Sequence, residues 1–146
     1  MDLSSLLWYH QIEVGIMADV SKQILQHIKT VYGVEPEYLW QNDDTAAIRH
    51  SDTKKWFGAY MKQLPKTKFG LCSDQKTDVI NLKCDPMLSY SLIDSKGVFP
   101  AWHMNKEHWI SVFLDGTVPA EEIYPLIRMS FQLTDRKTVS KKKKLC

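Results

Sequence analysis

Residues 100–119, PAWHMNKEHWISVFLDGTVP, constrain the fold more than any other part of the chain. Their apolar run, residues 109–114, places Trp, Ser and Phe on one side of an extended strand and Ile, Val and Leu on the other. Because both sides are mostly apolar, the run predicts a strand that other elements cover on at least one face. The Asp115-Gly116 pair accepts positive φ readily and closes the strand. A polar turn with two histidines, residues 103–108, precedes it.

Helix and strand signals on either side of this strand predict the rest of the fold. Val20, Ile24 and Ile28 recur at helical spacing and predict a helix over residues 20–32, which Gly33 ends. Strands are expected over residues 45–50, 55–61, 64–71, 77–84 and 98–102, and a short helix from Asp85-Pro86. A last helix is expected to begin at Thr117 or Val118, with Pro119 in its first turn, and Pro125 is expected to kink it or delay its regular part. This order predicts an α+β fold, a two-layer sandwich with an antiparallel sheet and helices packed mainly on one face.

The charge of the chain is divided unevenly along its length. The net charge is +2, but six of the 19 basic residues fall after residue 135, where there is no acidic residue. The 13 basic and 17 acidic residues before that point give residues 1–135 a net charge of −4. We therefore predict three parts: an N-terminal extension over residues 1–16, one folded domain over residues 17–135, and a basic disordered tail over residues 136–146.

Several motifs in one order resemble the MmcQ/YjbR family. They are WHMNKEHW at residues 102–109 with the strand and DG-x-VP that follow, NLKCDP at residues 81–86, KWF at residues 55–57 and YLW at residues 38–40. The resemblance covers about residues 17 to 136. It implies a fold that has been compared with CyaY and with secretion chaperones. Members of the family are commonly labelled DNA-binding on structural analogy, so DNA binding is the function that the resemblance implies.

Lysines gather between Asp52 and Asp74, where five lysines occur and no acidic residue. One interpretation is a lysine-rich hairpin that contacts phosphates. The other is a hairpin whose edge lysines only prevent strand pairing. Two further lysines, Lys83 and Lys106, could join a polar-aromatic surface at the rim of the sheet. Together with the first interpretation this gives the expected nucleic-acid-binding residues Lys54, Lys55, Lys66, Lys68, Lys83 and Lys106.

The turn over residues 103–108 has two further interpretations. His103 and His108 have a spacing found in half of a zinc site, but no second half follows, so no metal site is predicted. His103 and Asn105 are expected to bond to nearby backbone and fix the turn. Alternatively, a ligand-binding surface includes Trp102, His103, Asn105 and His108.

No catalytic constellation accompanies these residues. The chain has no nucleophile elbow, P-loop, dinucleotide fingerprint or kinase signature. We therefore expect no enzyme activity and no cofactor.

The expected location is the cytoplasm, without membrane contact. The three cysteines form no CxxC pair, no apolar run approaches the length of a membrane span, and the N-terminus lacks signal-peptide features. Two functions stay open: DNA binding through the lysine-rich hairpin and the basic tail, or a protein- or small-ligand-binding adaptor with no DNA affinity. The second function would involve a protein partner or self-association.

Overall fold

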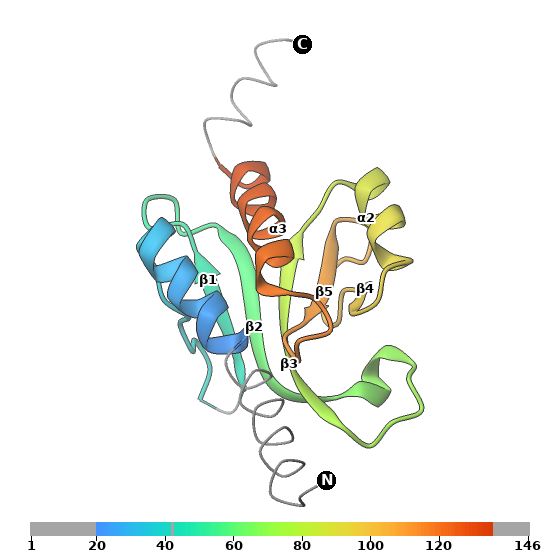
Figure 1. The fold of residues 1–146 in the computed structure, drawn as a ribbon. Coiled ribbons are helices and arrows are strands. Elements are labelled where there is room, and N and C mark those ends of the chain that lie inside the picture. The colour runs from blue at the N-terminus through green and yellow to red at the C-terminus, as the bar shows by residue number, and fades with distance from the viewer. Residues whose placement is uncertain (1–19, 42, 136–146) are drawn as a thin grey trace, which may run out of the picture.

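The computed structural model describes residues 20–41 and 43–135, which form one five-stranded antiparallel sheet with helices on one face (Figure 1). The strands lie in the order β1-β2-β3-β5-β4. A helix over residues 20–32 comes first. The elements after it are β1 Thr45–Arg49, β2 Trp56–Pro65, the 3-10 helix η1 Lys66–Phe69, β3 Lys76–Lys83, α2 Pro86–Ile93, β4 Val98–Pro100, β5 Trp109–Phe113 and α3 Ala120–Leu133. The predicted α+β fold is confirmed. The predicted extension over residues 1–16 and the predicted tail lie outside the described residues.

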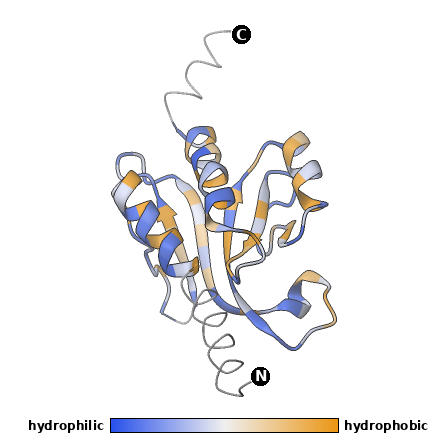
Figure 2. Cartoon of the chain, in the orientation of Figure 1, coloured by the Kyte–Doolittle hydropathy of each residue, from blue (hydrophilic) through white to orange (hydrophobic). Residues whose placement is uncertain are grey.

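The main core lies between the sheet and its helices. The 20–32 helix, blue in Figure 1, and α3 cover the same face of the sheet, and α2 packs beside β4 and β5. Figure 2 shows hydrophilic residues along the outward side of the 20–32 helix. Its apolar side supplies Ile24 and Ile28, both fully buried. They join fully buried side chains of the strands and α3, among them Ile48, Ile80, Leu82, Ile110, Val112, Ile123 and Ile127.

Asp78 of β3 anchors the start of the 20–32 helix. Its carboxylate accepts hydrogen bonds from the Ser21 hydroxyl at 2.9 Å and from the Tyr60 hydroxyl at 2.8 Å. It also accepts from the backbone N–H and the side-chain amide of Gln63, at 3.0 and 3.1 Å. Burial by itself would raise the pKa of Asp78, but these hydrogen bonds outweigh it and hold the pKa below its usual value. At the other end of the helix, Gly33 has a φ of 70° and ends it as predicted.

Ser130 of α3 is bonded to a bulge in the sheet. The register between β1 and β2 shifts by one residue between Ile48 and Arg49, so that Phe57 is an extra residue in β2. The Ser130 hydroxyl donates to the Phe57 carbonyl at 2.5 Å and accepts from the Lys83 backbone N–H at 2.8 Å. The Ser130 side chain thus bonds to the Phe57 carbonyl of β2 and to the Lys83 N–H of β3, two backbone groups that do not bond to each other. The helix continues through Pro125 and starts at Ala120, so Pro125 does not interrupt it.

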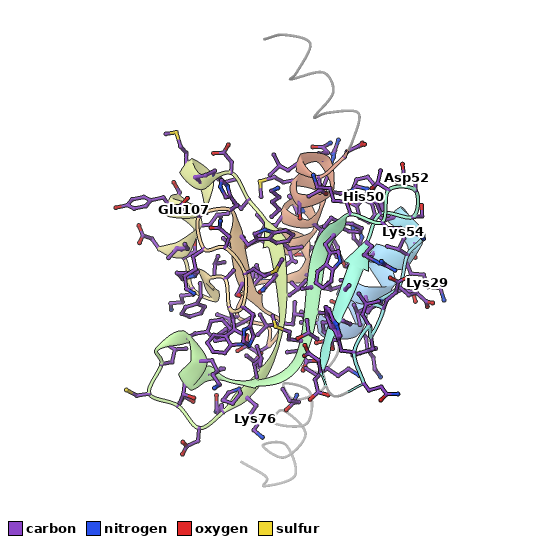
Figure 3. The ribbon with its side chains drawn as sticks, turned by 180° about the vertical axis from the view of Figure 1, so that it is seen from behind. Lys29, His50, Asp52, Lys54, Lys76 and Glu107 are labelled. Carbon is purple, nitrogen blue, oxygen red and sulfur yellow. The ribbon has the colours of Figure 1, made fainter. Side chains whose placement is uncertain are left out.

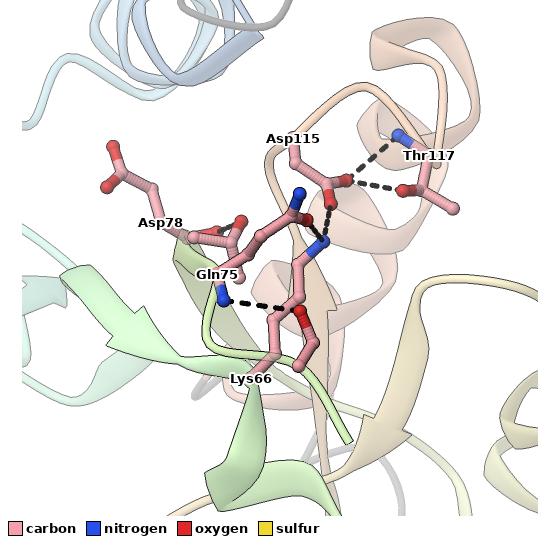
Figure 4. A network of polar contacts seen from close by, with 7 residues as sticks. Lys66, Gln75, Asp78, Asp115 and Thr117 are labelled. Atoms are coloured by element: carbon pink, nitrogen blue, oxygen red, sulfur yellow. Dashed lines mark hydrogen bonds and ion pairs between the residues drawn. The ribbon is translucent and has the colours of Figure 1, made fainter. Parts of the chain in front are cut away.

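The long strand β2 is the main difference from the prediction. It extends through Pro65, and η1 follows where a further strand over residues 64–71 was expected. That expectation was wrong because Lys66 leaves the sheet and is held by other partners (Figure 4). Its ammonium pairs with Asp115 at 3.0 Å and donates to the Gln75 side chain at 3.3 Å. Its backbone N–H donates to the Gln75 carbonyl at 2.9 Å. These bonds close the β2–β3 connection.

The second face of the sheet carries a smaller apolar cluster. Met61, Val79 and Phe113 are buried there, and Phe69 of η1, Phe99 of β4 and Trp102 pack against them. This cluster covers the end of the sheet near η1. We call the whole second face the open face, because neither the 20–32 helix nor α3 covers it (Figure 1). Among the described residues, no helix combines the length and the apolar composition that crossing a membrane requires.

Candidate functional site

Four side chains form a row across one end of the open face. Arg49 pairs with Trp56 across β1 and β2, and Lys83 pairs with Trp109 across β3 and β5. Neighbouring residues on each strand, such as Ile48, Leu82 and Ile110, face the helices, so strand alternation directs these four to the open face. All four are partly exposed. We call Arg49, Trp56, Lys83 and Trp109 the cation–tryptophan row.

Sheet topology brings three more lysines to the same end. The turn between β1 and β2 carries Lys54 and Lys55, and the turn before β5 carries Lys106. Because β1, β2, β3 and β5 are antiparallel neighbours, both turns lie at the end where β3 finishes with Lys83. Figure 3 looks onto the open face, and the labelled Lys54 and Glu107 mark the two turns that flank the row. Four of the six lysines expected to bind nucleic acid are therefore at one end of the sheet.

Lys83 and Lys55 form a pair of like charges. Burial lowers the pKa of Lys83, and the nearby positive charge of Lys55 lowers it further. Within the described part of the chain, neither ammonium has a carboxylate within 4.0 Å, whereas Arg49 pairs with Glu37. A bound anion such as a phosphate would relieve the repulsion between the two lysines.

The other two expected lysines lie elsewhere. Lys66 and Lys68 belong to η1, at the opposite end of the ten-residue strand β2, about 30 Å from Lys54 and Lys55 at the usual rise per residue. The side chain of Lys66 is only 17% exposed in its ion pair with Asp115. The ammonium of Lys68 lies 5.2 Å from the centre of the Trp102 ring. A single lysine-rich hairpin containing all four lysines is therefore not what the structure shows, because β2 is longer than predicted.

A hollow of about 280 Å³ adjoins the row at Trp56. Trp40 and Trp56 form one corner of it, with ring centres 6.0 Å apart and planes inclined at 47°. The opposite side is made by the segment after β4. The complete lining is Trp40, Asp43, Thr45, Trp56, Ala59, Met61, Asn81, Trp102, His103 and Met104. Two of the residues expected to bind a ligand, Trp102 and His103, thus line a common hollow, while Asn105 and His108 do not.

A buried polar cluster fixes the segment that carries Trp102 and His103. Asn81 and Ser111 are fully buried on the open face. The Ser111 hydroxyl donates to the Asn81 side-chain carbonyl at 2.5 Å and accepts from the Trp102 backbone N–H at 3.0 Å. The Asn81 side-chain amide donates to the Trp102 carbonyl at 2.8 Å. This cluster holds both backbone groups of Trp102 against the sheet, next to His103, whose φ is 65°.

The turn that follows is fixed by Asn105, as predicted. The Asn105 side-chain carbonyl accepts from the Glu107 backbone N–H at 2.9 Å, and the Asn105 backbone carbonyl accepts from the Trp109 backbone N–H at 2.9 Å. No comparable hydrogen bond of the His103 side chain is present. Across residues 20–41 and 43–135, no three His, Cys, Asp or Glu side chains converge as they would around a metal ion. Cys72 and Cys84 are free thiols, and burial raises the pKa of Cys84 to about 11.

Four side chains of this surface were not predicted from sequence. Trp40, Asp43, Arg49 and Trp56 were assigned to a loop or to a strand without a functional role. The signal was present, because YLW and KWF place two tryptophans just before two strands that pair. Their convergence depends on the path of residues 34–44, which bridges to β1 through Glu37 and Ala47.

Comparisons with known proteins identify relatives of the chain. A family model described as YjbR matches residues 29–133. The uncharacterized protein YyaQ of Bacillus subtilis (strain 168) is 44% identical over 114 residues, which cover 77% of this chain and 96% of that protein. The uncharacterized protein YjbR of Escherichia coli (strain K12) is 37% identical over 67 residues, 45% of this chain and 57% of that protein.

Solved structures share the fold. The crystal structure of a protein from Pseudomonas syringae has a TM-score of 0.74 at 43% identity, covering 78% of this chain and 97% of that one. The crystal structure of a Deinococcus radiodurans protein has a TM-score of 0.56 at 25% identity, covering 77% and 78%.

Proposed function

This chain belongs to the YjbR family, and from that premise and the geometry of the open face we propose that it is a DNA-binding protein without catalytic activity. The observation that carries the proposal is the cation–tryptophan row. Arginine and lysine neutralise phosphates, and indole rings stack on bases, so a row in which cations and indoles alternate suits a nucleic-acid strand. The proposed surface differs from the lysine-rich hairpin expected from sequence, because it consists of the row with Lys54, Lys55 and Lys106 in the flanking turns and excludes Lys66 and Lys68.

The like-charged pair Lys55 and Lys83 supports phosphate contact at this end. An ammonium that is partly buried beside another ammonium is destabilised as a cation. Binding of a phosphate there offsets that cost, whereas a lysine already paired with a carboxylate gains less from it. The supporting contrast is Lys66, whose charge Asp115 neutralises.

Fluorescence anisotropy of labelled duplex and single-stranded DNA, measured over a salt series, tests the proposal. We expect the affinity of the full chain to fall steeply with salt. The double variant Lys55→Gln/Lys83→Gln removes two phosphate contacts, so the slope of log K against log salt for duplex DNA should decrease by about 1.8. The matched control is Lys22→Gln/Lys29→Gln, which removes the same charge from the 20–32 helix.

The control is expected to keep the slope of the unmodified chain. Equal slopes for both double variants would contradict the proposal. A chain ending at Asp135 separates the contribution of residues 136–146: if binding disappears with those residues alone, the DNA contact lies in them and the open face has another function.

A second candidate function is a protein-binding adaptor, and α2 favours it. Met87 and Tyr90 of α2 are 83% and 82% exposed, next to Leu88 at 41%. Exposed apolar side chains in one place are typical of contact surfaces between proteins. If α2 mediates self-association, sedimentation velocity will show an oligomer that the variant Met87→Glu/Tyr90→Glu converts to a monomer. A chain that is monomeric in both forms would exclude self-association through α2.

A further inference from the structure

The hollow beside the row has a chemical character different from that of the row itself. Tryptophan rings supply three of its lining side chains, and Met61 and Met104 supply two more. No lysine or arginine lines it. Its one carboxylate is that of Asp43. Phosphate is therefore a poor occupant of the hollow, since no lysine or arginine lines it and the Asp43 carboxylate repels an anion.

Most polar groups around the hollow already have partners. The Asn81 side chain bonds to Ser111 and Trp102, as described above. The Thr45 backbone N–H donates to Asp43 Oδ1 at 2.9 Å. The groups left for a ligand are the aromatic faces, the methionine thioethers, the His103 imidazole and the Asp43 carboxylate. Such a site offers negative electrostatic potential and few hydrogen-bond acceptors.

The carboxylate of Asp43 is held in its ionised form. Hydrogen bonding by Thr45, with a smaller contribution from the positive charge of His103, keeps the pKa of Asp43 below its usual value. The negative charge at the rim of the hollow is therefore present at neutral pH.

The shape of the aromatic wall suits a rounded cation. The Trp40 and Trp56 rings both line the hollow and are inclined to each other at 47°, so they form an angled aromatic wall and not a flat stack. Trp40 is 51% exposed, although burying it would stabilise the fold. Trp102 already carries the ammonium of Lys68 over its ring, which shows that this aromatic surface accepts a cation.

We propose that the hollow lined by Trp40, Trp56, Trp102 and Asp43 binds an alkylated ammonium group, such as that of choline or of a methylated lysine side chain. A primary ammonium is strongly hydrated and needs three hydrogen-bond acceptors, which the hollow does not offer. An alkylated ammonium needs few or none, and its methyl groups make apolar contact with the indole rings while its charge interacts with their faces and with the carboxylate. This site shares Trp56 with the row, but its ligand has the opposite charge to DNA, and its test uses choline in place of DNA.

Titration of the full chain with choline, followed by tryptophan fluorescence at constant ionic strength, tests this proposal. The comparison ligand is the neutral isostere of choline, in which a tert-butyl group replaces trimethylammonium. We expect choline to bind about tenfold more tightly than the isostere, because only choline carries the charge. Equal affinities would overturn the proposal, and so would the absence of choline binding.

Variants locate the binding in the hollow. Asp43→Asn should weaken choline binding about fivefold or more, while Asp44→Asn, which changes a neighbouring exposed carboxylate outside the lining, should leave it unchanged. Trp40→Ala removes one wall and, because Trp40 is half exposed, should preserve the thermal unfolding midpoint while reducing choline affinity about tenfold. If Asp43→Asn and Asp44→Asn behave alike, or if Trp40→Ala binds choline normally, the cation does not bind in the hollow.

Discussion

Two buried polar residues, Asn81 and Ser111, hold the Trp102 backbone in place on the open face. Asn81 and Ser111 are polar groups in the interior, and such groups are stable only when their partners are supplied. Their partners are each other and the backbone of Trp102. The polar cluster therefore places one wall of the hollow.

At this scale we predict that Ser111→Ala destabilises the fold. The change leaves the Asn81 side-chain carbonyl and the Trp102 backbone N–H without their partner, at a cost of about 2 kcal/mol in the free energy of unfolding. Urea denaturation measures it. Ser51→Ala, in the exposed turn between β1 and β2, is the control and should change the free energy by less than about 0.5 kcal/mol. A loss of equal size in both variants would show that the cluster does not stabilise the fold.

Asp78 gives the fold a predictable dependence on pH. Its pKa in the folded state is below the value of about 3.9 expected when unfolded, so its contribution to stability is present above that pH and is lost as the pH falls through the folded pKa. We expect Asp78→Asn to be less stable than the unmodified chain at pH 7 and to lose less stability between about pH 5 and pH 3. Denaturation at several pH values measures both. Asp74→Asn, in an exposed loop, removes the same charge and should follow the unmodified chain.

Strands and helices were largely predictable from sequence, and their lengths and partners were not. Alternation placed Trp109, Ser111 and Phe113 on one side of β5, and the structure confirms it. Period-two patterns do not say how far a strand continues, so β2 was predicted too short, and its full length separates Lys66 and Lys68 from Lys54 and Lys55. The bulge at Phe57 and the convergence of Trp40 with Trp56 depend on pairing between segments, which local patterns do not contain.

Two glycines next to secondary-structure elements differ in the space available for a side chain. Gly97, before β4, has a φ of 83°, and a Cβ atom there would lie 2.7 Å from Val118 Cγ2. Gly70, after η1, has a φ of 80° with no atom within 4 Å of such a Cβ. Both Ala variants strain the backbone by about 1 kcal/mol, but Gly97→Ala also creates a clash and should cost about 3 kcal/mol in total. Equal unfolding free energies for the two variants would mean that the segment at Val118 moves freely.

At the scale of the whole molecule, the two faces of the sheet differ in the side chains they carry. The helix-covered face holds the main core, and the open face carries the cation–tryptophan row and the hollow. Composition alone argued against DNA binding, because residues 1–135 have a net charge of −4. The sheet topology nevertheless concentrates positive charge locally, because it brings Lys54, Lys55, Lys83 and Lys106 to one end of the sheet from three separate segments of the chain.

The central claim, that the open face is the binding surface, is tested most directly by NMR. Amide and indole N–H signals of the full chain would be followed while a DNA oligonucleotide is added. We predict that the largest shift changes occur at Lys55, Trp56, Lys83 and Trp109, including the indole signals of both tryptophans. Changes confined to the 20–32 helix and α3, or to residues 136–146, would contradict the claim.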